Sequence, residues 1–149
     1  MVPQFRKDAT MDGVRGRGAH VVLAILAGIV AAAVGALIWM GITIVTGYHI
    51  GYVALGVGAL VGLTVRYVGN GTSVVFGIIG AVLTLIGCLG GEILTAIQLS
   101  TTQQHDFFSA LATTDLNQLV TNIFDRMDPL MYLIYAIGIF EGFKFSIRK

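Results

Sequence analysis

The residue whose type and position point most directly to chemistry is Glu92, an acid inside a long apolar stretch that ends near Leu99. An ionisable group at such a depth in a bilayer costs several kcal/mol unless it is paired or hydrated, and it is therefore a candidate functional site. His49, in a short turn expected at the same level, is the nearest candidate partner. We expect an ion or proton site at Glu92 and His49, or else a carboxylate satisfied by His49, Tyr48 or a hydroxyl, or held at a subunit contact.

A second acid, Glu141, lies in the last apolar stretch, three residues before Lys144 and therefore on the same helical face. Arg66 is expected at the same depth. This spacing favours a structural salt bridge among Glu141, Lys144 and Arg66 over a site that binds a ligand. Arg66 alone is also long enough to reach lipid headgroups.

The remaining chemistry-bearing residues form no recognisable catalytic or metal site. The single cysteine, Cys88, excludes an internal disulfide, a CxxC pair and a zinc ribbon. His20 is expected on the opposite side of the membrane from His49 and His105, so the three cannot share one metal ion. We expect no enzyme activity, no metal, no cofactor and no nucleic-acid partner.

Composition identifies the elements that must position these residues as membrane spans. Of 149 residues, 56% are hydrophobic and 11% charged, whereas a soluble domain has about 25% charged residues. We predict an all-α integral membrane protein with four transmembrane helices. Their approximate ranges are 19–45, 51–67, 73–99 and 129–147.

Small residues recur every three or four positions in these spans, which places them on one helical face each. Small faces let helix backbones approach closely in lipid. We therefore predict a tight central hairpin of the second and third spans. The first span has its own small series, Ala24, Gly28, Ala31 and Gly35. The expected packing positions elsewhere are Gly51, Ala54, Gly58 and Gly62, then Gly77, Gly80, Thr84, Gly87, Gly91 and Thr95, and finally the Gly138 and Gly142 pair.

Polar segments flank the spans. Residues 1–18 are expected to form a basic tail, and 100–128 an interfacial segment with one apolar face at Leu116, Leu119, Val120, Ile123, Phe124 and Met127. Either Thr114 or Asp115 is a suitable N-cap, and Pro129 suits the first turn of the last span. Asn70-Gly71 predicts a turn. Trp39 is expected in an aromatic belt at the end of the first span.

Charge placement predicts the orientation. Eight basic residues lie on the side of the two termini, namely Arg6, Lys7, Arg15, Arg17, Arg66, Lys144, Arg148 and Lys149, and only Arg126 lies on the other. Because basic residues favour the cytoplasmic side, both termini are expected there, with 100–128 facing outward.

Three segments together resemble a family of uncharacterised bacterial multi-pass membrane proteins. They are the glycine-rich stretch from Gly51 to Arg66, the stretch from Gly69 through Phe76 to Gly90, and the ending Tyr135–Ser146 (YAIGIFEGFKFS). Some members of that family carry an N-terminal zinc ribbon, which has no counterpart here. The resemblance implies a bacterial inner membrane but no activity and no site residues.

Several helix faces carry small residues, more than one hairpin needs. We therefore expect a non-enzymatic packing module: a scaffold or accessory subunit that binds other membrane proteins or copies of itself. The alternative is a small ion channel or proton-coupled transporter with Glu92 as its site.

Overall fold

The computed structural model describes residues 5–48, 51–70, 73–101, 109, 112–113 and 115–147. Throughout these ranges the regular structure is helical and contains no strand, which confirms the all-α prediction. The principal helices are α1 (Phe5–Thr46), α2 (Val53–Gly69), α3 (Val74–Thr101), α5 (Leu116–Arg126) and α6 (Pro129–Ser146).

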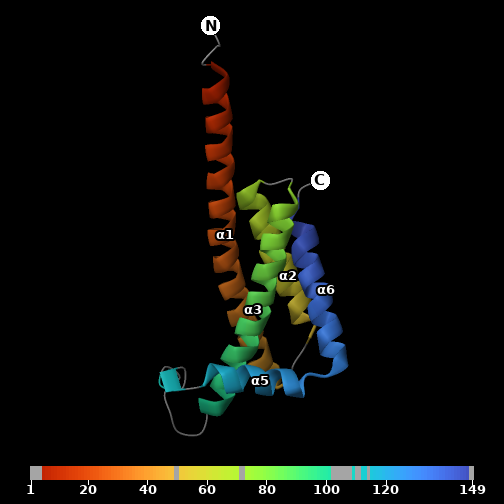
Figure 1. The fold of residues 1–149 in the computed structure, drawn as a ribbon. Coiled ribbons are helices and arrows are strands. Elements are labelled where there is room, and N and C mark those ends of the chain that lie inside the picture. The colour runs from red at the N-terminus through yellow and green to blue at the C-terminus, as the bar shows by residue number, and fades with distance from the viewer. Residues whose placement is uncertain are drawn as a thin grey trace.

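Four of these helices form a bundle, and the fifth lies across one end of it (Figure 1). α1, α2, α3 and α6 run alongside one another, and each reverses the direction of the one before it. α5 crosses the bundle where α1 ends and α6 begins, which we name the α5 end. The N- and C-termini lie toward the opposite, terminal end.

The segment expected as a basic tail is helical from Phe5 onward, because α1 continues through it without a break. α1 contains 42 residues, roughly 63 Å of helix. Figure 1 shows its first turns extending past the ends of α2, α3 and α6 at the terminal end. We name the stretch Phe5–Arg17 the arm.

The turns and caps follow the chemistry of their residues. Asn70 takes a positive φ of 47° as the C-cap of α2, and its N–H donates to the Arg66 carbonyl at 3.0 Å, as expected for an Asn-Gly turn. The Asp115 carboxylate accepts from the Asn117 N–H at 3.0 Å and caps α5. Pro129 occupies the first turn of α6. These predicted positions are confirmed.

Two helices of the described chain, Gly18–Thr46 and Val74–Leu99, are long and apolar enough to cross a membrane. α2 is apolar but shorter, and α6 combines apolar residues with Glu141 and Lys144. The buried share of the most apolar window is only 33% in the first helix and 44% in the second. More than half of each of these windows therefore lies outside the fully buried interior.

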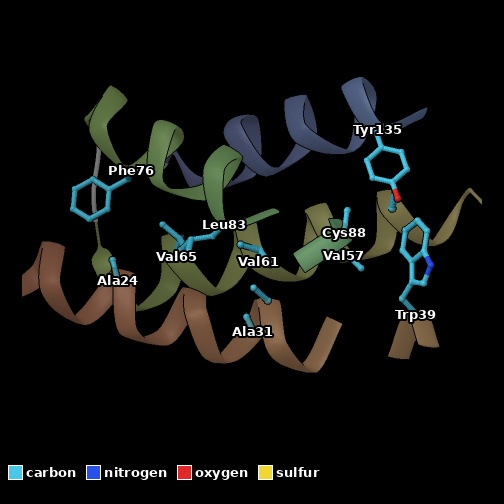
Figure 2. Close-up of a cluster of buried hydrophobic side chains, with 12 residues drawn as sticks. Ala24, Ala31, Trp39, Val57, Val61, Val65, Phe76, Leu83, Cys88 and Tyr135 are labelled. Carbon is cyan, nitrogen blue, oxygen red and sulfur yellow. The ribbon is translucent and has the colours of Figure 1, made fainter. Parts of the chain in front are cut away.

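The interior of the bundle is built from small and β-branched residues, closed at each end by aromatic rings (Figure 2). Val57, Val61 and Val65 of α2 form its centre. Phe76 lies at the terminal end, whereas Trp39 and Tyr135 lie toward the α5 end.

The predicted small-residue faces are all buried, but they do not pack as one hairpin. A Cβ on Gly58 would collide with the backbone of Gly138, and a Cβ on Gly62 would lie 2.8 Å from Phe145 Cβ, both on α6. The closest neighbour of α2 is thus α6. α2 and α3 are in contact, as expected for a hairpin, but the small-residue face of α2 packs on α6 and not on α3.

The face of α3 divides among three partners, since a Cβ on Gly87 would lie 3.1 Å from Val57 of α2 and 3.3 Å from Ala32 of α1. Gly77 and Gly80 approach α6, through Phe143 and Ser146 respectively. Gly91 lies against Trp39 of α1. The small residues therefore connect all four helices of the bundle, which spacing along one helix cannot reveal.

Candidate functional site

Glu92 lies inside the bundle, with 6% of its surface exposed, and it accepts a hydrogen bond from Tyr135. The distance from Tyr135 Oη to Glu92 Oε1 is 3.2 Å. Tyr135 belongs to α6 and is itself buried, so the bond joins two helices that are distant in sequence. Burial of an acid is costly unless it is hydrogen-bonded, and the tyrosine supplies one such bond.

Trp39 of α1 completes the surroundings of this pair. Its ring centroid lies 5.8 Å from that of Tyr135, with the planes tilted by 53°, a favourable arrangement for two aromatic rings. Trp39 is 1% exposed. The expectation that it belongs to an aromatic belt at the membrane surface is therefore wrong.

Trp39 is buried because a glycine of α3 lies opposite it. A Cβ on Gly91 would lie 2.8 Å from both Cβ and Cγ of the tryptophan, so the indole packs directly on the α3 backbone. The missing side chain at Gly91 provides the room that admits the largest side chain into the interior.

Two further polar side chains of α3 lie beside Glu92. Cys88, one turn earlier, is 1% exposed, and Thr95, one turn after Gly91, is fully buried. The Thr95 hydroxyl donates to the Gly91 carbonyl at 2.7 Å. We name Trp39, Cys88, Glu92, Thr95 and Tyr135 the Glu92 cluster. Its groups can hold a proton or bind a small polar molecule, and they can also join three helices.

The other predicted site residues are not part of this cluster. His49, the expected partner of Glu92, lies outside the described residues, as does His105. Arg66 is in the last turn of α2, and Lys144 in the last turn of α6, both at the terminal end. Glu141 is half-buried on α6. The salt bridge among these three residues stays a prediction.

Tyr135 was missed as a site residue, although the sequence contains a signal for it. The buried residues of α6 are Tyr135, Gly138, Gly142 and Ser146, spaced three, four and four apart. Tyr135 is therefore on the face of the glycine pair that was predicted to pack. Extending that face by one turn would have placed the tyrosine in the interior.

Comparison with family models, curated proteins and solved structures found no match to this chain.

Proposed function

We propose that this chain is a non-enzymatic, four-span membrane protein that acts as an accessory subunit or scaffold of a membrane complex. The observation that carries the proposal is the arm, Phe5–Arg17, which continues α1 past the end of the bundle (Figure 1). Among the helices that the structure describes, none other extends beside this stretch (Figure 1).

The distribution of exposed residues supports four spans. α1 and α3 expose large aliphatic side chains along their length, for example Leu26, Val34 and Ile86. Exposed tyrosines lie at both ends of α2: Tyr52 is 73% exposed and Tyr67 is 79% exposed. These two residues are roughly 22 Å apart along the helix, which is less than the hydrocarbon core of about 30 Å, so we expect the bilayer to be thinned locally around α2.

The charges support an orientation with both termini in the cytoplasm. Arg66 and Lys144 lie at the terminal end, and the arm there contains Arg6, Lys7, Arg15 and Arg17. Positively charged segments remain preferentially on the cytoplasmic side. Together with the resemblance to bacterial membrane proteins, this favours the inner membrane of a bacterium.

The small-residue faces no longer support an outside partner, since they pack on helices of the same chain. We therefore propose that the arm, and not these faces, binds the partner subunit. The arm continues α1 and needs no nucleus of its own, but Gly13 and Gly16 lower its helix propensity. A cytoplasmic domain of a partner subunit that packs against the arm would stabilise it.

Co-purification from the native membrane tests this function. The full chain, tagged at its C-terminus, is compared in mild detergent with a chain that begins at Gly18. We expect a defined partner with the full chain and its loss with the shortened one, with equal thermal stability of the two bundles. Identical recovery of a monomer from both chains contradicts the proposal, whereas a pure homo-oligomer restricts it to self-assembly.

The buried carboxyl of Glu92 favours a second candidate, a small channel or proton-coupled transporter. In liposomes, wild-type protein is compared with Glu92→Gln, and Tyr132→Phe serves as a surface control. Cation or proton flux that is present in the wild type and lost in Glu92→Gln supports this candidate. Equal flux excludes Glu92 as the site, and no flux in any sample excludes transport of these ions.

A further inference from the structure

The indole N–H of Trp39 is a buried donor without an acceptor. Among the buried side-chain nitrogens and oxygens of the described residues, Trp39 Nε1 is the one without a hydrogen-bond partner. The residue is 1% exposed. A buried donor left without an acceptor costs free energy, so such a group calls for a specific explanation.

The Glu92–Tyr135 pair does not supply the acceptor. Figure 2 shows the indole nitrogen on the edge of the ring turned away from Tyr135. The phenol hydroxyl donates to Glu92 at 3.2 Å, and neither group of this pair forms a direct hydrogen bond with the indole. The partner of the indole must therefore come from another part of the α1–α3 contact.

Two buried threonines lie one turn from this contact. Trp39 of α1 packs on Gly91 of α3, and the two helices run in the same direction. Thr43 and Thr95 follow Trp39 and Gly91 by four residues each, so each lies one turn nearer the α5 end on the same helical face. Thr43 is 5% exposed and Thr95 is fully buried.

The hydroxyl of Thr95 is suited to accept a hydrogen bond. It donates its hydrogen to the Gly91 carbonyl at 2.7 Å, and a hydroxyl that donates in this way retains acceptor lone pairs. Neither threonine bonds the indole directly. Polar groups separated by more than direct hydrogen-bond distance are commonly joined by a water molecule.

We propose that one buried water molecule is bound between α1 and α3, where it accepts from Trp39 Nε1 and donates to the hydroxyl oxygens of Thr43 and Thr95. Three polar partners are a usual number for an internal water. The site brings a solvent molecule to the turn beside Glu92, because Gly91, on which the indole packs, directly precedes that acid. The inference is independent of whether the chain binds a partner or moves ions.

The single tryptophan allows a direct test. The full chain, labelled with ¹⁵N in the indole and held in lipid nanodiscs, gives one indole N–H signal. We expect magnetisation transfer between this proton and a long-lived water in the wild type. Absence of that transfer in the wild type overturns the proposal, and this measurement requires no variant.

Threonine variants then locate the water. Thr95→Val or Thr43→Val is expected to shift the indole proton and to reduce the transfer several-fold. Thr84→Val is the matched control, because Thr84 is also fully buried on α3 and donates to Gly80 at 2.7 Å, but it packs near Gly142 instead of Trp39. An equal effect of Thr84→Val, or none from Thr43→Val and Thr95→Val, also overturns the proposal.

Discussion

At the scale of single residues, the Glu92 cluster joins three helices at one level of the bundle. Glu92 of α3 accepts from Tyr135 of α6, and the ring of Tyr135 packs on Trp39 of α1. The polar bond thus lies beside two buried aromatic rings. Such a cluster fixes the positions of the helices relative to one another along the bundle axis, whether or not it also binds a proton.

Loss of the tyrosine hydroxyl should destabilise this end of the bundle. Tyr135→Phe leaves a buried acid with one donor fewer, and interhelical hydrogen bonds in membranes contribute about 0.6 kcal/mol on average, with values up to about 1.7. We expect a decrease of about 1 kcal/mol in the free energy of unfolding, measured by denaturation in mixed micelles. Glu92→Gln should lower the free energy of unfolding by less, because the amide oxygen of the glutamine can still accept a hydrogen bond from Tyr135.

Tyr132→Phe is the control for that measurement. Tyr132 is on the same helix but 46% exposed, and it donates to the Phe124 carbonyl at the surface. Tyr132→Phe should lower the free energy of unfolding by clearly less than Tyr135→Phe does. If the two variants have the same free energy of unfolding, the hydrogen bond to Glu92 does not contribute to the stability of the fold.

At the scale of helices, spacing in the sequence predicts faces but not the partners of those faces. Gly58 and Gly80 were placed on packing faces, and both are buried. Both, however, approach α6 instead of the other helix of the predicted hairpin. Which helix occupies a face depends on the shapes of all four helices together, and one periodic pattern carries no information about that.

Two glycines on α2 provide a matched test of this packing. A Cβ on Gly58 would collide with the α6 backbone at Gly138, whereas a Cβ on Gly56, two residues earlier, would meet nothing within 4 Å. We expect Gly58→Ala to lower the free energy of unfolding by about 1–3 kcal/mol, since overpacking against backbone is poorly relieved. Gly56→Ala should be neutral or stabilising by about 0.5–1 kcal/mol, because alanine favours helix. Equal effects of the two changes would rule out a close α2–α6 contact.

α5 is a separate case, because a local signal was sufficient to predict it. Its apolar face is partly covered at Leu119, Val120 and Ile123, and its N-cap is one of the two residues proposed from sequence. Phe124 stacks on Tyr132, with ring centroids 6.4 Å apart, which ties the helix to the start of α6. A cap and an amphipathic pattern are local properties and can be read without knowledge of the fold.

Removal of the cap should therefore loosen α5 alone. Asp115→Ala deletes the acceptor for the Asn117 N–H, and such a loss costs about 1 kcal/mol of helix stability. We expect faster amide hydrogen exchange in α5 with no change in α2 or α3. Asp125→Ala, near the C-terminal end of the same helix, should not have this effect. Unchanged exchange in Asp115→Ala would contradict the role of the cap.

At the scale of the whole molecule, composition was a good guide to fold class and to the ends of the apolar segments, but not to the residue at which the first helix begins. The first span was expected to begin near Ala19, and the apolar part of α1 begins at Gly18. The helix itself begins earlier, at Phe5, because a helix, once nucleated, is extended at low cost. Trp39 was misplaced for a different reason. An aromatic residue near the end of a span suits both a lipid interface and an interior contact, and only Gly91 on another helix decides between them.

In the arrangement that we propose, all four helices of the bundle cross the bilayer, with both termini on the cytoplasmic side. Single-cysteine labelling tests it directly, because the one native cysteine, Cys88, is buried and can be changed to alanine. Exposed probe positions are Tyr48 and Asn117 toward the α5 end and Asn70 at the terminal end. We expect a membrane-impermeant thiol reagent to label Tyr48→Cys and Asn117→Cys in intact cells, and Asn70→Cys only after permeabilisation. Labelling of Asn70→Cys from the same side as the other two would contradict the four-span account.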